Sequence, residues 1–311
     1  PYITILSLFE NTHESLRVHI LHDDSIHHGR AELEALAAKY GQEILFHRVP
    51  DFDPDFASAI SKWFNLGTMY RYFVADFIKS DKVIYLDCDV IVNRDIKELH
   101  EIPLGSHLIA AVKDNSHYWD KQGKVKAKFR EKIDYLKLNP DDCFEAGVMV
   151  INLARLRELN ANGNIFMERT KAALDSGIDL QYPDQDIMNA VCAEIPDGLL
   201  LLDESFNSFR GVLHLHRDEL EGKIVQFITS KKLDARLFPG HLVYWKYYAM
   251  SPFAGDMIER LDATLKSRHM VFLRNYALYP SRQRRASDLL AYGFWGMIWQ
   301  ACRRALGLKS N

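Results

Sequence analysis

The sequence lacks closely spaced cysteines, a net positive charge and any long uninterrupted apolar run. The four cysteines lie far apart and form no Cys-x-x-Cys pair, which excludes a disulfide scaffold and is typical of free thiols in a reducing compartment. The formal net charge of −3 argues against nucleic acid as the main partner. Because 48% of the 311 residues are hydrophobic and 26% are charged, disorder is excluded and one large domain or two ordinary domains are expected.

Charge is distributed unevenly along the chain. Residues 274–311 contain seven basic side chains and one acidic one, so this segment carries +6 and the remaining residues carry −9. Within it, the 14-residue apolar stretch Leu289–Cys302 is shorter than the ~20 residues needed to cross a bilayer. Its tryptophans and the arginines on both sides predict a helix in a membrane interface, although a helix packed on the acidic body is the alternative. We therefore predict a main domain at 1–272 and a basic tail at 273–311.

Short apolar runs alternate with segments of helical spacing. Lys82–Leu86 is a nearly continuous apolar run, which is typical of a central parallel strand covered on both faces. The alternation predicts an α/β fold with a mixed, mainly parallel sheet flanked by helices. The expected strands lie at 17–22, 43–47, 82–86, 107–112 and 148–151, and the expected helices at 30–40 and 69–78.

Two carboxylates follow the apolar run that ends at Leu86. Asp87 and Asp89 stand at positions i and i+2, so strand alternation turns both side chains to one side. Ligands of open α/β sheets bind beyond the carboxyl ends of strands, and two oxygen ligands suit Mg²⁺ or Mn²⁺. Without a metal, Asp87 caps a turn and Asp89 is solvated. An aspartyl phosphotransferase is a further alternative, but such enzymes carry the acid pair on their first strand.

The segments around this acid pair resemble those of family 8 glycosyltransferases. The core signature is matched by Tyr70–Phe73 and Lys82–Val92, and the later segments follow in the family's order at Phe144–Leu153 and Asp184–Asn189. Residues 2–23 resemble the family's first helix and second strand. The resemblance covers roughly residues 1–265, and several ordered motifs together are far more specific than Asp-x-Asp alone.

The resemblance implies a GT-A fold and a retaining transfer of a hexose from UDP-glucose or UDP-galactose to a glycan or lipid-linked acceptor. It also implies that Mn²⁺, or Mg²⁺, neutralises charge on the leaving UDP. By this resemblance the metal ligands are Asp87, Asp89 and Gln226. The catalytic residues are Asp184 and Gln185, and the donor is held by Arg71, Asp87, Cys88, Asp89, Glu145, Ala146, Gly147, Lys231 and Lys232.

Three of these roles have specific physical content. The resemblance makes Asp184 a sugar-hydroxyl ligand and places Gln185 near the anomeric carbon, where a neutral amide oxygen stabilises positive charge but is a poor nucleophile. The planar guanidinium of Arg71 suits two-point contact with phosphate or hydroxyl groups. The structural alternatives are an N-cap for Asp184 and an ion pair for Arg71.

The sequence departs from the family pattern near its end. Gln226 stands where the family has a histidine ligand, and Leu233-Asp234 replaces Pro-Trp. Glu145 stands where the family prefers Asn or Asp, and we expect it to add negative charge near the donor. His241 is a possible substitute ligand, but the residues after it resemble a segment beyond the metal motif. These departures favour, as the alternative function, a nucleotide-sugar-binding protein with weak or lost transferase activity.

Two expectations concern the ends of the sequence. The chain starts at Pro1 inside or just before the family's first helix, so the first strand is expected to be missing from the sequence. The basic aromatic tail resembles that of bacterial lipopolysaccharide-core glycosyltransferases. This likeness implies a cytoplasmic protein bound peripherally at the inner face of the cytoplasmic membrane.

Overall fold

The computed structural model describes residues 1–256, except for 28, 62–64, 115–117, 120–121, 211, 213–214, 216 and 229–239. The predicted tail at 273–311 and the predicted donor ligands Lys231 and Lys232 lie outside the described residues, as does the side chain of His241. The predictions made for these residues stay predictions.

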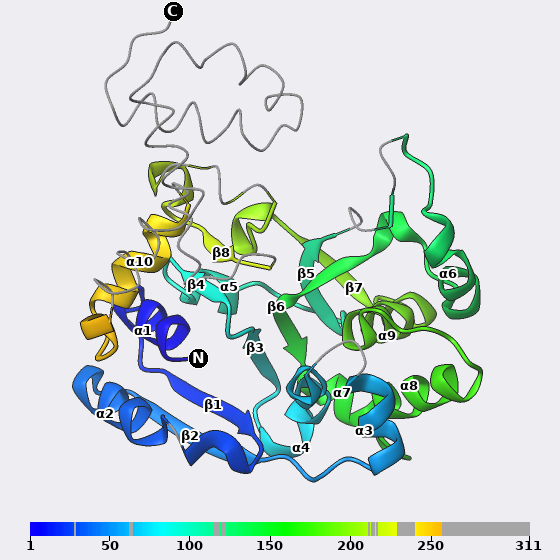
Figure 1. Ribbon diagram of the computed structural model, residues 1–311, viewed down its shortest axis with the longest axis horizontal. Coiled ribbons are helices and arrows are strands. Elements are labelled where there is room, and N and C mark those ends of the chain that lie inside the picture. The colour runs from blue at the N-terminus through cyan, green and yellow to red at the C-terminus, as the bar shows by residue number, and fades with distance from the viewer. Residues whose placement is uncertain are drawn as a thin grey trace, which may run out of the picture.

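The first part of the chain forms a helix-covered pair of parallel strands (Figure 1). Helix α1 (Tyr2–Asn11) leads into β1 (Arg17–His22), and α2 (Arg30–Tyr40) connects β1 to β2 (Glu43–Arg48). The sequence predicts both strands and α2 at these positions, and the structure confirms them. Gly41 ends α2 with a φ of 63°, a left-handed conformation that glycine adopts without steric cost.

Four strands form the central sheet in the order β3-β6-β5-β7. They are β3 (Lys82–Leu86), β6 (Phe144–Asn152), β5 (Ile109–Lys113) and β7 (Leu199–Leu202). β6 runs antiparallel to both β3 and β5, whereas β5 and β7 are parallel.

A short antiparallel pair, β4 (Val90–Val92) with β8 (Ile224–Gln226), lies beyond the end of β3. The predicted mixed α/β architecture is confirmed, but the prediction of mainly parallel pairing is wrong for the described strands. Of their pairings, two are parallel and three are antiparallel. The prediction that Lys82–Leu86 is a parallel strand is also wrong, because β3 pairs antiparallel with β6. An apolar run indicates that a strand is buried, but not the direction of its neighbour.

Helices surround this sheet (Figure 1). The predicted helix at 69–78 is instead a 3-10 stretch, η2 (Leu66–Phe73), followed by the short α4 (Val74–Phe77). Within this stretch the Arg71 Nε donates a hydrogen bond to the Thr68 carbonyl at 3.1 Å. The other α-helices are α3 (Pro54–Ser61), α5 (Lys97–His100), α6 (Arg130–Leu136), α7 (Leu153–Leu159), α8 (Ile165–Asp175), α9 (Pro183–Glu194) and α10 (His241–Ala249). Short 3-10 turns occupy Asp24–His27, Ala127–Phe129, Pro140–Asp142, Glu204–Phe206, Arg217–Leu220 and Ala254–Asp256.

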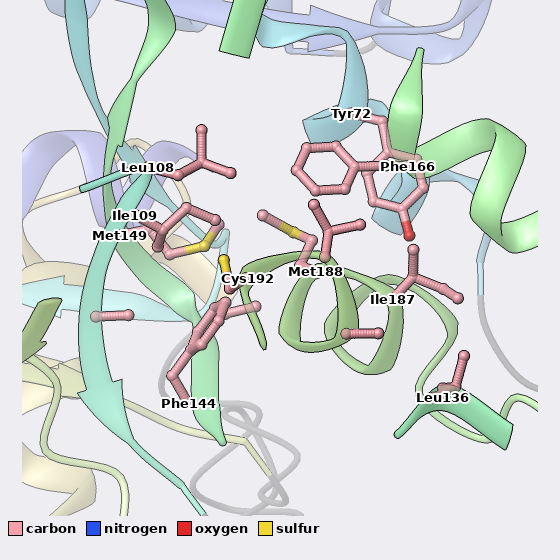
Figure 2. Close-up of a cluster of buried hydrophobic side chains, with 14 of the residues drawn as sticks. Tyr72, Leu108, Ile109, Leu136, Phe144, Met149, Phe166, Ile187, Met188 and Cys192 are labelled. Carbon is pink, nitrogen blue, oxygen red and sulfur yellow. The ribbon is translucent and has the colours of Figure 1, made fainter. Parts of the chain in front are cut away.

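Strand β6 is buried on both faces and divides the core in two. Met149 and Ile151 face one apolar cluster, which packs against α8 and α9, and Val148 and Val150 face the other, which packs against α1 and α10. Figure 2 shows the first cluster, in which Phe144 and Met149 approach the α9 side chains. Because side chains alternate along β6, this one strand contributes to both clusters. The same strand contains most of the motif Phe144–Leu153.

A cavity of about 960 Å³ separates β1 from β3. Val18 and Ile20 border it on one side and Ile84 on the other, and it reaches Asp87 and Cys88 at the end of β3. Among the described strands, β1 pairs with β2 and β3 pairs with β6, so the facing edges of β1 and β3 both border this slot.

Candidate functional site

The acid pair lies in the turn that joins β3 to β4. The backbone N–H of Asp87 donates to the Gly147 carbonyl at 2.8 Å, and the Asp89 carbonyl accepts from the Phe227 N–H at 3.1 Å. Tyr85, two residues before Asp87 on the same side of β3, donates its hydroxyl to Asp87 Oδ1 at 2.8 Å. Strands β6 and β8 therefore fix the turn from both sides, so the carboxylates stand on a rigid part of the fold.

Arg71 is buried and links this turn to the start of α9. Its Nη2 donates to Asp87 Oδ1 at 2.8 Å, and its Nη1 lies 3.1 Å from Asp184 Oδ2. Nη1 also donates to the Ala146 carbonyl at 2.9 Å, and the guanidinium stacks over Tyr85. Burial acts to lower the pKa of Arg71, but Asp184 and Asp87 outweigh burial and raise it. The structural ion pair considered from the sequence is present, and contact with the donor stays a prediction.

The electrostatics of Asp87 favour a further positive charge. Burial raises the pKa of the Asp87 carboxyl above its ordinary value, and the neighbouring Asp89 adds to the increase, while Arg71 opposes it. Both Arg71 and Tyr85 contact Oδ1, whereas Oδ2 faces the side chain of Gln226. A cation at Oδ2 would relieve the repulsion between the two carboxylates.

The two predicted catalytic residues lie at the beginning of α9. Helix α9 starts at Pro183 after Tyr182, so Asp184 is inside the first turn and the N-cap interpretation is wrong. Its Oδ2 accepts a hydrogen bond from Thr68 Oγ1 at 2.8 Å as well as facing Arg71. Gln185 Oε1 accepts from the Ala146 N–H at 3.1 Å. These contacts bring the start of α9, the middle of β6 and the acid pair into one site.

Gln226, at the end of β8, lies against both aspartates. Its Nε2 is 3.4 Å from Asp87 Oδ2 and 3.3 Å from Asp89 Oδ1, and its Oε1 accepts from Asn207 Nδ2 at 3.0 Å. Gly147 provides the space, because a Cβ there would lie 2.1 to 2.5 Å from the Gln226 amide atoms. The strand pairing therefore brings Gln226 against both aspartates, and its role as a metal ligand stays a prediction.

Glu145 lies beneath this group and is buried. Burial, followed by the charge of Asp87, raises the pKa of its carboxyl to about 8. Its Oε2 accepts from the Gly147 N–H at 2.7 Å and from Asn207 Nδ2 at 2.6 Å. This raised pKa, caused first by burial, reduces the negative charge that Glu145 is expected to add near the donor.

The side chains present fit a divalent cation in part. Asp87 and Asp89 supply oxygen ligands, but the described residues contain no group of three or more His, Cys, Asp or Glu side chains arranged to hold a metal. Gln226 turns its nitrogen, which cannot coordinate, toward the carboxylates, and its oxygen becomes a ligand once the amide is inverted. Cys88, between the aspartates, is exposed.

Three residues of the site were not found from the sequence. Tyr85 follows the same alternation as Asp87 and Asp89, so strand spacing contains the signal that would identify it. Thr68 lies just ahead of the motif that contains Arg71. Asn207 is in a loop after the 3-10 turn Glu204–Phe206, with no motif around it, and only the fold brings it to Gln226.

The mixed sheet, the acid pair beyond β3 and the polar start of α9 together form the candidate site. Residues 2–233 match the family model described as glycosyl transferase family 8, so the chain belongs to this family. The family assignment made from the motifs is thereby confirmed.

Solved structures show the same fold. The galactosyltransferase LgtC in complex with donor and acceptor sugar analogues superposes with a TM-score of 0.62 at 20% identity, covering 80% of this chain and 91% of that chain. The bifunctional glycosyltransferase WbbM superposes with a TM-score of 0.60 at 20% identity, covering 83% of this chain and 48% of that chain. The predicted GT-A fold is confirmed by this likeness.

Curated relatives are bacterial glycosyltransferases. Lipopolysaccharide 1,3-galactosyltransferase of Salmonella typhimurium is 25% identical over 207 residues, which are 65% of this chain and 57% of the relative. A putative glycosyltransferase of Haemophilus influenzae is 27% identical over 196 residues, or 62% and 56%. The probable glycosyl transferase Gly of Streptococcus gordonii is 36% identical over 119 residues, or 38% and 14%. The alignments thus span from 14% to 57% of these relatives. Within the described part of this chain, no helix has the length and apolar character to cross a membrane.

Proposed function

We propose that the protein is a retaining glycosyltransferase that moves glucose or galactose from a UDP-sugar to a glycan or lipid-linked acceptor. The observation that carries the proposal is the convergence of Arg71, Asp87, Asp89, Asp184 and Gln185 at one place, although they come from three separate motifs. The family membership, a relative named for lipopolysaccharide galactosyl transfer and a neighbour solved with sugar analogues support the same class.

In this proposal Asp87 and Asp89, with Gln226 after inversion of its amide, hold Mn²⁺ or Mg²⁺, which when bound offsets negative charge on the departing diphosphate. Arg71 keeps its charge within contact of both Asp87 and Asp184. It therefore orients Asp87, the proposed metal ligand, relative to Asp184, the proposed ligand of a sugar hydroxyl. Asp184 retains hydrogen-bonding capacity toward a sugar hydroxyl, because a carboxylate accepts more bonds than the Thr68 and Arg71 contacts use.

Gln185 is suited to stabilise charge rather than to form a covalent bond. Its Oε1 accepts one hydrogen bond from the Ala146 N–H, which fixes the amide and leaves a second lone pair available. A fixed neutral oxygen facing a developing oxocarbenium charge lowers the barrier without reorganisation of the site. This arrangement favours retention through attack on the same face as the leaving group.

The second candidate is a nucleotide-sugar-binding protein with weak or lost transferase activity. The orientation of Gln226 favours it, because an amide N–H already faces the two carboxylates where a cation needs oxygen. Membrane association and a position at the inner face of the cytoplasmic membrane depend on the tail at 273–311. That segment lies outside the described residues, and both remain predictions.

The test is UDP release by the full 311-residue chain from UDP-glucose and from UDP-galactose, with and without Mn²⁺. Asp87→Asn and Gln226→His are assayed beside it. Mn²⁺-dependent release that disappears in Asp87→Asn supports the transferase and names the donor. Release only in Gln226→His indicates an intact scaffold with a weak third ligand. No release from either, with UDP still bound, would favour the binding protein.

A further inference from the structure

We propose that Asn189 is a positioning residue that sets the place of the Gln185 amide through the free edge of β6. The inference rests on the proposed function, because Gln185 is proposed there to stabilise charge at the anomeric carbon. Asn189 is the last residue of the motif Asp184–Asn189, and the motif by itself assigns it no role. It is buried, with 4% of its surface exposed, whereas Gln185 is partly exposed.

The first residues of β6 extend past the end of β3. The last residue of β3, Leu86, pairs with Val148, so Phe144 and Ala146 have no neighbour on β3. These two residues are buried, with exposed fractions of 0% and 1%. Buried backbone N–H and C=O groups need hydrogen-bond partners, so this free edge of β6 requires partners from outside the sheet.

Three side chains take the place of a neighbouring strand along this edge. Asn189 Oδ1 accepts from the Phe144 N–H at 2.8 Å, and Asn189 Nδ2 donates to the Phe144 carbonyl at 3.1 Å. Gln185 Oε1 accepts from the Ala146 N–H, and Arg71 Nη1 donates to the Ala146 carbonyl. The Asn189 amide thus exchanges two hydrogen bonds with one residue, as the opposite residue does in an antiparallel hydrogen-bonded pair.

Helix α9 and strand β6 have matching spacings where they meet. Gln185 and Asn189 are four residues apart, which is about 6 Å along a helix. Ala146 and Phe144 are two residues apart, which is about 6.6 Å along a strand. Because α9 packs beside the start of β6 (Figure 2), both amides reach the edge at once. The contact of Asn189 with the strand therefore fixes the register of Gln185 against it.

Asn189 also holds the backbone of Gln185. Its Nδ2 donates to the Gln185 carbonyl at 2.9 Å as well as to Phe144. Inversion of the Asn189 amide would bring an N–H against the Phe144 N–H, so the amide has one orientation. The main chain of Gln185 is thus held by Asn189, and its side chain by Ala146. Since Arg71 binds the carbonyl of Ala146, the same strand edge sets Gln185 relative to Arg71.

The first measurement is UDP release from UDP-galactose and from UDP-glucose, with Mn²⁺, by the full chain and by Asn189→Leu. A misplacement of about 1 Å costs about a hundredfold in rate, so kcat should fall by about that factor while KM is unchanged. The matched control is Asn152→Leu, at the other end of β6. Its side chain also makes two hydrogen bonds to backbone atoms, those of His107 and Arg155, and its loss should leave kcat unchanged.

A double-mutant cycle separates positioning from a general loss of stability. In a Gln185→Ala background there is no amide to position, so Asn189→Leu should lower kcat no further. A second readout needs no activity. Hydrogen exchange of the Ala146 N–H, relative to the amides of β5, should be about fivefold faster in Asn189→Leu, the order of one net hydrogen bond. If Asn189→Leu does not fold, Asn189→Asp replaces it, because it keeps an acceptor for the Phe144 N–H and loses both donors.

Three results would overturn the inference. The first is unchanged kcat in folded Asn189→Leu and Asn189→Asp. The second is a further loss of kcat when Asn189→Leu is added to Gln185→Ala. The third is unchanged hydrogen exchange of the Ala146 N–H in both variants. If the wild type releases no UDP, the proposed function fails, and the exchange of Ala146 still decides whether Asn189 positions Gln185.

Discussion

Two acidic centres of the molecule, Asp186 and Asp87, differ in burial and in chemistry. Asp186 is 0% exposed and is surrounded by fixed donors: Lys132 Nζ at 2.5 Å and Tyr118 Oη at 2.7 Å. Asp87 is 25% exposed, and its Oδ2 lies 3.4 Å from the neutral amide nitrogen of Gln226. A carboxylate whose oxygens accept short hydrogen bonds from fixed donors stabilises the fold. A carboxylate oxygen with only long contacts is better able to receive a ligand.

The comparison shows that one short motif combines both roles. Asp184 contacts Arg71 and Thr68 in the candidate site. Asp186, two residues later, joins α9 to α6 through its ion pair with Lys132. Fixing Asp186 to Lys132 holds the first turn of α9 and therefore the position of Gln185. The predictions below test this division between structural and ligand-binding acids.

The largest effect is expected for Lys132→Met. Removing the cation leaves Asp186 buried without its charged partner, which should cost about 3–5 kcal/mol of unfolding free energy. Urea denaturation measures it. The control is Arg169→Met, which breaks the more exposed ion pair with Glu194 and should cost at most about 1 kcal/mol. Equal losses in the two variants would show that Asp186 is not a structural centre.

A smaller loss is expected for Gly147→Ala. The added methyl group would overlap the Gln226 amide, and such overpacking costs about 1–3 kcal/mol. Thermal unfolding with its enthalpy reports the loss, and Mn²⁺ affinity should change with it because Gln226 is displaced. Adding Gln226→Ala to Gly147→Ala should restore most of the stability. No recovery in the double variant would contradict the contact described here.

Glu145→Gln should change the pH dependence of stability. The pKa of Glu145 is about 8 in the folded chain, above its ordinary value of 4.5. Below pH 4.5 the folded and unfolded states both keep the proton, so the wild type loses nothing there. As pH rises from 4.5 to 8 the unfolded state ionises first, and wild-type stability falls.

The Glu145→Gln variant lacks this loss, so its stability relative to the wild type should increase by at least about 1 kcal/mol across that pH range. Denaturant midpoints at several pH values measure the difference, with the exposed Glu34→Gln as control. A difference that does not vary with pH would show that Glu145 is ionised in the folded protein throughout.

The sequence predicts the elements of the fold better than their directions. The strands at 17–22, 43–47 and 82–86 and helix α2 were identifiable from apolar periodicity. That periodicity does not reveal that β6 runs antiparallel to β3, because burial is the same for either direction. It also missed that η2 is a 3-10 stretch, in which Arg71 makes tertiary contacts with Asp87 and Asp184 that apolar spacing does not record.

For the candidate site, motif residues were predictable and supporting residues were not. Asp87, Asp89 and Gln226 were placed together by resemblance, and the structure brings them within contact. Asn207 comes from a loop without a motif, and the raised pKa of Glu145 depends on burial that a linear sequence does not record. Interactions between distant segments thus determine which oxygen or nitrogen each motif residue presents.

The most direct test of the central claim is Mn²⁺-dependent binding of UDP to wild type and to Asp89→Ala, measured by calorimetry on the full chain. We expect Mn²⁺ to strengthen UDP binding by the wild type and to have no effect on the variant, whose thermal unfolding should be unchanged. UDP affinity that responds to Mn²⁺ equally in both proteins would contradict the assignment of the acid pair as the cation site.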